Sequence, residues 1–128
     1  MRGVSPMSND ITALSDFEIN VLVATALHLQ VQEIDDSRKT GMTTWYHEQM
    51  PNTVWVSNGD EPWYQFAPCN SAEDAWPIIE GQQISLLFNW NEFGLHGATS
   101  EFPGHNCEHG NVLRAAMCVF LMDEGVLR

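Results

Sequence analysis

The chain has 128 residues, of which 44% are hydrophobic, and its 17 acidic residues outnumber five Lys and Arg to give a net charge of −12. This length and hydrophobic fraction fit one globular domain with its own core and exclude an intrinsically disordered chain. The negative charge excludes direct binding to nucleic-acid phosphates or to an anionic membrane, because like charges repel.

Residues 1–13 are polar and lack the apolar core of a signal peptide. We expect them to form a flexible tail, with a single domain over residues 14–128. The longest apolar run, Ala115–Met122, is too short to cross a bilayer. The cysteines show no paired spacing, which is typical of a reducing compartment. A soluble cytoplasmic protein is therefore expected.

The first predicted element is a helix from about Ser15 to Gln30. Ser15 and Glu18 have the spacing of a capping box. His28, near the predicted end, suits the helix dipole, so we expect it to cap rather than to catalyse. The apolar stripe recurs at three- and four-residue steps, at Phe17, Val21, Ala24 and Val31.

Short runs of β-branched and aromatic residues follow, at 43–49 (TTWYHEQ), 53–57 (TVWVS) and 62–66 (PWYQF). Such runs predict strands. Asn58 and Gly59 lie between the last two runs, and both residue types accept a positive φ. They therefore favour a hairpin between these strands.

A second helix is expected to start near Ser71 and to settle over Ala75–Glu80, with Pro77 close to its first turn. The run ISLLFNW, residues 84–90, alternates in apolar side chains and predicts a strand with Phe88 and Trp90 on its buried face.

Residues 91–110 are rich in Gly and predict a long loop. The stretch Asn111–Gly125 then predicts a helix capped by Asn111. It is apolar nearly all round, so we expect it at the centre of the core. The fold class is therefore α+β: a single small domain with three helices packed on a short antiparallel sheet of three or four strands.

The segment GHNCEHG places His105, Cys107 and His109 at alternate positions, where they could face one zinc ion, with Glu101 or Glu108 as a base for bound water. However, ligands spaced by single residues seldom reach a tetrahedron, and no C-x-x-C or H-E-x-x-H motif supports them. The sequence also has no nucleophile elbow and no phosphate-binding loop. We therefore expect a polar loop, with no metal, no cofactor and no catalytic residues.

The segment NGDEPWYQF places Asp60 and Glu61 before Trp63 and Tyr64 at an expected loop tip. Aromatic residues beside a charged rim are typical of protein interfaces. These four residues are therefore the candidate partner-binding residues. The alternative is that Trp63 or Tyr64 turns inward and belongs to the core, which is the commoner arrangement.

Three pieces of the chain are informative when they are taken together: LSDFEIN (Leu14–Asn20), CNSAEDAWPIIEGQQISL (Cys69–Leu86) and NVLRAAMCVFLMDEG (Asn111–Gly125). Together they resemble small phage and prophage accessory proteins of the NinX type, over less than half of the chain. The resemblance implies an accessory role in a bacterial host cell. It implies no activity and supplies no catalytic residues.

These features predict a non-enzymatic phage or prophage accessory protein that binds a host or phage protein, to counter host defence or to redirect a host process. An alternative is an acidic nucleic-acid mimic that inhibits a DNA- or RNA-binding host protein. Mimicry requires carboxylates at phosphate-like spacing on one face, yet they are scattered along the chain, with clusters such as Glu33–Asp36, Asp60–Glu61 and Glu73–Asp74. A metal-dependent enzyme is the third class.

Overall fold

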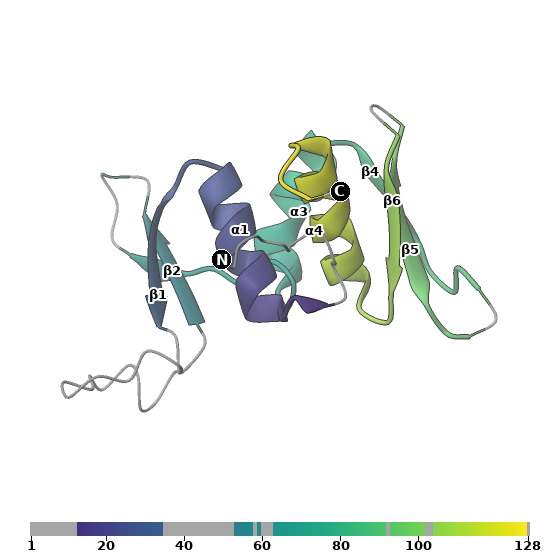
Figure 1. Ribbon diagram of the computed structural model, residues 1–128, viewed down its shortest axis with the longest axis horizontal. Coiled ribbons are helices and arrows are strands. Elements are labelled where there is room, and N and C mark those ends of the chain that lie inside the picture. The colour runs from purple at the N-terminus through teal and green to yellow at the C-terminus, as the bar shows by residue number, and fades with distance from the viewer. Residues whose placement is uncertain are drawn as a thin grey trace.

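The computed structural model describes residues 13–34, 53–57, 59, 63–91, 93–101 and 104–127. In these ranges a layer of helices lies between two antiparallel sheets (Figure 1). The helices are α1 (Asp16–Ala26), α3 (Ala72–Gly81) and α4 (Val112–Asp123). The first sheet has the order β1 (Gln30–Ile34), β2 (Thr53–Ser57), β3 (Tyr64–Gln65), and the second β4 (Ile84–Leu87), β5 (His96–Ser100), β6 (Asn106–His109).

The predicted α+β class is confirmed, but the prediction of one sheet with three or four strands is wrong. The described residues form two three-stranded sheets, one on each side of the helix layer (Figure 1). The first sheet packs against α1 and the second against α4. Within the described ranges, no helix is both long and apolar enough to cross a membrane.

Helix α4 is the centre of the core, as predicted. Its residues from Arg114 to Leu121 are all buried, because α1 and α3 cover one side of it and the second sheet covers the other. The side chain of Asn111 caps it, with Oδ1 accepting from the backbone N–H groups of Leu113 at 3.0 Å and Arg114 at 3.3 Å. An apolar stretch on every side of a helix therefore correctly indicated a buried helix.

The first helix begins as predicted but ends earlier. Ser15 and Glu18 form the capping box. The predicted extension to Gln30 is wrong, since α1 ends at Ala26 and His28 adopts a left-handed φ of 62° that turns the chain into β1. Val31 still packs against the core, but from a strand. The helical spacing therefore extended to Val31 by coincidence.

Two other elements partly match their predictions. Helix α3 starts after Ser71, and it is continuous from Ala72 with Pro77 inside it. Strands β2 and β3 pair antiparallel, with Val56 opposite Tyr64, which confirms the predicted hairpin. The predicted strand at 43–49 lies outside the described residues, as do residues 1–12 of the predicted tail.

The segment that follows α3 differs most from the prediction. Strand β4 ends at Leu87 rather than at Trp90, because Asn89 takes a φ of 54° and reverses the chain. Phe88 is consequently 64% exposed rather than buried. The predicted loop over 91–110 contains β5 and β6. Strand β5 buries small residues such as Ala98 against α4, so it lacks the large alternating side chains that indicate a strand.

The capping box gives a stability prediction. Ser15→Ala should lower the free energy of unfolding by about 0.5–2 kcal/mol, because the Glu18 N–H loses the hydroxyl that accepts its bond at 3.1 Å. Ser71→Ala is the matched control, since Ser71 occupies the same position at α3 without a side-chain cap bond. Denaturant midpoints measure both changes. Equal losses for the two variants would contradict the assigned cap.

Candidate functional site

The described part of the predicted partner-binding segment faces outward. Trp63 and Tyr64 are each 45% exposed, so neither ring is part of the core. Asp60 and Glu61 lie outside the described residues. Tyr64 stands in β3 at the edge of the first sheet, next to the helix layer.

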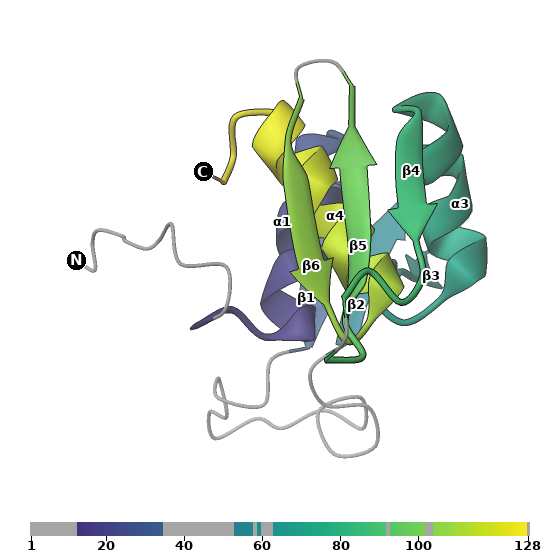
Figure 2. The same cartoon turned by 90° about the vertical axis from the view of Figure 1, so that its right-hand side faces the viewer.

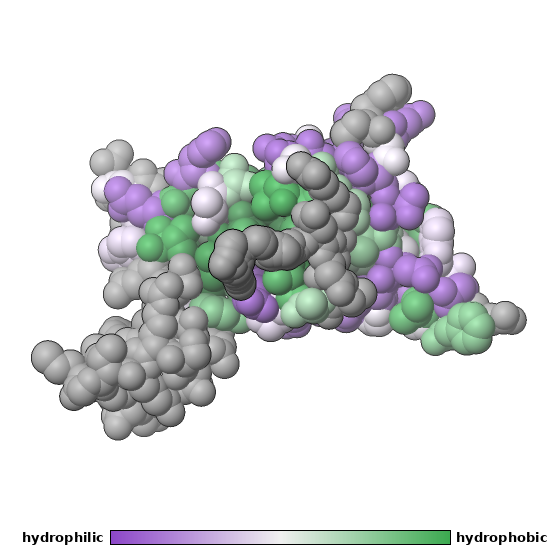
Figure 3. All heavy atoms as spheres, viewed as in Figure 1, coloured by the Kyte–Doolittle hydropathy of each residue, from purple (hydrophilic) through white to green (hydrophobic). Residues whose placement is uncertain are grey.

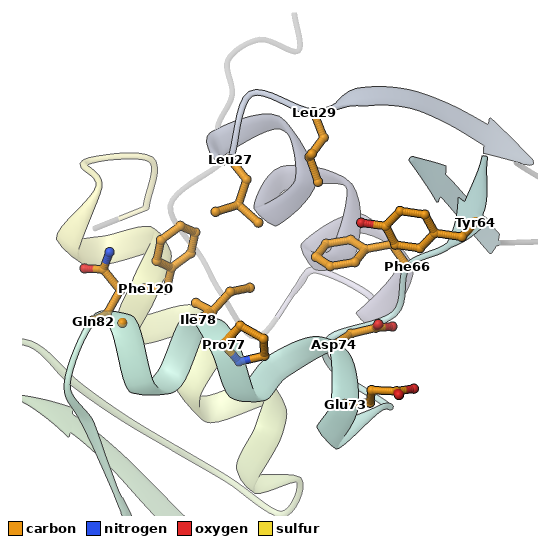
Figure 4. Close-up of a pocket in the computed structure, with 11 residues that line it drawn as sticks. Leu27, Leu29, Tyr64, Phe66, Glu73, Asp74, Pro77, Ile78, Gln82 and Phe120 are labelled. Atoms are coloured by element: carbon orange, nitrogen blue, oxygen red, sulfur yellow. The ribbon is translucent and has the colours of Figure 1, made fainter. Parts of the chain in front are cut away.

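Tyr64 forms one wall of a groove with a volume of about 550 Å³ (Figure 4). The groove lies where the end of α1, β3, α3 and α4 meet, and its lining is mainly apolar. Phe66, Ile78 and Phe120 are 5%, 7% and 2% exposed, so their side chains are held by the core behind them. The apolar lining residues are Leu27, Leu29, Tyr64, Phe66, Pro77, Ile78 and Phe120.

The end of α1 supplies the wall opposite α3. Because His28 adopts the left-handed conformation, the helix stops and the chain turns directly above the groove. Leu27 and Leu29, on either side of His28, both point toward the groove (Figure 4). Leu27 is 37% exposed, which is unusual for a leucine at the end of a core helix.

Helix α3 makes one end of the groove acidic. Glu73 and Asp74 lie in its first turn, where the helix dipole favours negative charge, and Figure 4 shows them at the same end as Tyr64. Asp74 accepts a hydrogen bond from the Ala67 N–H at 2.9 Å, which fixes the start of α3 to the preceding segment. Pro77 has no N–H to donate, so the Glu73 carbonyl lacks its usual helical partner.

The lining combines apolar side chains with two carboxylates and one phenol. Among the described residues that line the groove there is no serine, cysteine or histidine. The arrangement offers a rigid apolar floor, a tyrosine hydroxyl at the rim and negative charge at one end. Such a groove can accept an apolar side chain that has a basic neighbour.

The three candidate metal ligands, His105, Cys107 and His109, alternate along β6 and the residue before it, on the face that packs on α4. Each of the three has a different partner. His105 Nδ1 lies 2.7 Å from Asp123 Oδ1, and His109 Nδ1 accepts from the Asn111 N–H at 2.9 Å. Cys107 packs against the core beside Cys118. Among the described residues no group of three His, Cys, Asp or Glu side chains could hold a metal ion.

Sequence reasoning missed Asp123, which lies 18 residues from His105. Its side chain is 4% exposed, and its Oδ1 also accepts from the Ser100 hydroxyl at 3.0 Å. Ser, His and Asp therefore meet, but the hydroxyl bonds the carboxylate and not the imidazole. In a nucleophilic triad the imidazole accepts the serine proton. This cluster ties the β5–β6 turn to the end of α4.

A family model described as Bacteriophage P22, NinX matches residues 10–124. The chain belongs to this family of phage proteins. The predicted resemblance is confirmed, and its extent was underestimated, since the match includes the middle of the chain and residues 91–110. Neither the search of curated proteins nor that of solved structures gave a match.

In this NinX-family protein the three motif pieces meet at one polar cluster. Arg114, whose side chain is 6% exposed, donates to Asp16 Oδ1 at 2.8 Å and to the Leu14 carbonyl at 2.7 Å. Asn20 and Asn111 both bond the backbone of Cys69, in the second motif piece. Asn20 Oδ1 accepts from the Cys69 N–H at 3.0 Å, and Asn111 Nδ2 donates to the Cys69 carbonyl at 2.7 Å. These polar motif residues therefore build the scaffold, while other residues of the same motif pieces, such as Asp74, Ile78 and Phe120, line the groove.

The three thiols differ in their environments. The Cys107 and Cys118 thiols are neighbours, and their interaction lowers the pKa of Cys107 and raises that of Cys118. Burial and the neighbouring Asp16 raise the pKa of Cys69 to about 12. Cys107 is also the one of the three that is not fully buried.

Iodoacetamide at neutral pH should therefore modify Cys107 at least about tenfold faster than Cys69 or Cys118, because the thiolate is the reactive form. Mass spectrometry of peptides from the native protein measures the three rates. Labelling in denaturant, where the three rates should converge, is the control. Modification of Cys69 as fast as Cys107 in the native protein would contradict the assigned environments.

Proposed function

We propose that this NinX-family protein is a non-enzymatic accessory protein of a phage or prophage that binds a host or phage protein through the groove at Tyr64. The observation that carries the proposal is an exposed tyrosine beside a groove whose apolar floor is fixed by the core. Tyrosine and tryptophan are enriched among the residues that dominate interface energies.

The shape and charge of the groove indicate what part of a partner enters it. Its volume of about 550 Å³ accommodates one or two large side chains. The floor is already ordered before binding, so little conformational entropy is lost there. Glu73, which is exposed, would favour Lys or Arg next to the entering apolar side chain.

Membership of a phage family gives the proposal its biological setting. The protein would act in the cytoplasm of the bacterial host cell, where binding to a host protein counters defence or redirects a host process. The expected non-enzymatic role is supported by the lining of the groove and by the Ser100 hydroxyl, which is bonded to Asp123.

The acidic mimic ranks second because several described acids already have internal partners. Asp16 bonds Arg114, Asp74 accepts from Ala67, and Asp123 accepts from Ser100 and His105. These carboxylates are committed to the fold and do not contribute to an array that imitates phosphates.

The test is affinity capture from a bacterial host lysate with the wild-type chain and single variants, followed by measurement of Kd for the captured protein. Tyr64→Ala should weaken binding by at least about 2 kcal/mol, or roughly 30-fold, without unfolding the protein. Trp76→Ala is the matched control. Trp76 is 55% exposed on α3 but does not line the groove, so its loss should change Kd by less than about threefold.

Two results would contradict the proposal. If Tyr64→Ala and Trp76→Ala bind alike, the groove is not the interface. If neutralising exposed acids far apart, such as Glu18, Glu80 and Glu124, abolishes binding while Tyr64→Ala leaves it intact, the acidic mimic replaces the groove as the leading function.

A further inference from the structure

The outer face of the second sheet carries a tryptophan that lies across the backbone. The Trp90 ring covers Gly97, and a Cβ at position 97 would lie 2.5 Å from Cε3 and 2.6 Å from Cδ2 of the ring. Only glycine allows so close an approach. Trp90 nevertheless remains 44% exposed, so the sheet supports the ring on one side while part of it faces solvent.

Strand register places this ring on the side of the sheet that faces away from α4. Leu87, Gly97 and Glu108 are cross-strand partners, so they share one face. The neighbouring set includes Ala98 and Cys107, which pack against the core on the other face. The ring therefore lies on the outer surface, on the same face as Glu108, whose backbone pairs with Gly97.

The connection from β4 to β5 is built to hold Trp90 in this place. It folds back across the outer face of the sheet (Figure 2). The Trp90 N–H donates to the Leu95 carbonyl at 2.7 Å, and Asn91 Oδ1 accepts from the N–H groups of Phe93 at 2.8 Å and Leu95 at 3.4 Å. Hydrogen bonds within the connection, rather than burial of its aromatic rings, thus position the tryptophan.

A small apolar patch is visible at the end of the molecule that carries the second sheet (Figure 3). Phe88 and Phe93, on either side of Trp90, are 64% and 78% exposed. Exposed aromatic side chains so close together in the chain are typical of an interaction site rather than of a core element.

The charge on this face is negative, and no described Lys or Arg lies near it. Glu108 is exposed, and its Oε2 accepts from Asn91 Nδ2 at 3.3 Å, which holds the carboxylate next to the connection. Arg114 is the only Lys or Arg in the part of the chain that the structure describes, and it is buried on α4 beside Asp16. The net charge of −12 adds to the attraction for a cation.

We propose that Trp90 and Glu108 form a binding site for an arginine side chain of a partner protein. The planar guanidinium stacks on the exposed face of the indole, and the Glu108 carboxylate accepts its N–H groups. A nucleobase could also stack on the ring, but its phosphates would be repelled by Glu108 and by the net charge. A sugar could stack as well, but it would make no use of the negative charge. This surface is separate from the groove and does not depend on Tyr64.

The test uses the full chain labelled with ¹⁵N and two short peptides. One carries a single arginine between glycines, and the other replaces it with citrulline, which has the same shape without the charge. The indole N–H signal of Trp90, identified by its loss in Trp90→Phe, should shift with the arginine peptide. The apparent Kd should be at least about tenfold lower than for the citrulline peptide.

Glu108→Gln should weaken binding of the arginine peptide at least about fivefold and leave binding of the citrulline peptide unchanged. Since Glu108 is exposed, this variant tests the site even if Trp90→Phe fails to fold. Glu80→Gln, an exposed acid on α3, is the matched control and should have no effect. Tyr64→Ala should also leave the response intact, which separates this site from the groove.

Three outcomes would overturn the proposal. The first is an equal response to arginine and citrulline, and the second is no shift of the Trp90 signal with either peptide. The third is a shift caused by maltohexaose or by a single-stranded adenylate hexamer but not by the arginine peptide, which would assign the platform to a sugar or to a nucleobase.

Discussion

The bonds made by the Arg114 guanidinium hold together parts of the chain that are distant in sequence. Its partner Asp16 lies 98 residues away, at the start of α1. A buried guanidinium that lost its acceptors would keep its charge without compensation, which costs several kcal/mol. The start of α4 and the start of α1 must therefore come together in one arrangement. Asn20 and Asn111 add the segment around Cys69 to the same cluster.

Both proposed binding surfaces depend on this arrangement, because each uses a different side of α4. Phe120 of α4 forms part of the groove floor beneath Tyr64, while the opposite side of the helix supports the second sheet and its Trp90 platform. A protein with two such surfaces could contact one partner at two places or bring two partners together.

The sequence predicted the elements whose signals are local. The Ser15–Glu18 capping box, the Asn111 cap and the apolar run of α4 each depend on residues close together in the chain, and all three are confirmed. Strand β5 of the second sheet was missed because its buried residues are small, as at Gly97 and Ala98, and such residues give no alternating apolar pattern.

The sites could not be predicted in the same way because they join distant residues. The groove combines side chains from four elements, none of which is unusual by itself. Trp90 was expected on a buried strand face, since nothing local indicates that Asn89 reverses the chain. The outward position of Tyr64 agrees with the interface interpretation, whereas the partner of His105 could be found only in three dimensions.

The most direct test of this account is a double-mutant cycle between Asp16 and Arg114, measured as the free energy of unfolding of Asp16→Asn, Arg114→Met and the double variant. We expect a coupling energy of at least about 1 kcal/mol, because either single substitution breaks the same ion pair. Arg114 and Glu124, about 15 Å apart along α4, are the control pair and should couple by less than about 0.5 kcal/mol. A coupling near zero between Asp16 and Arg114 would contradict the claim that this ion pair organises the helix layer.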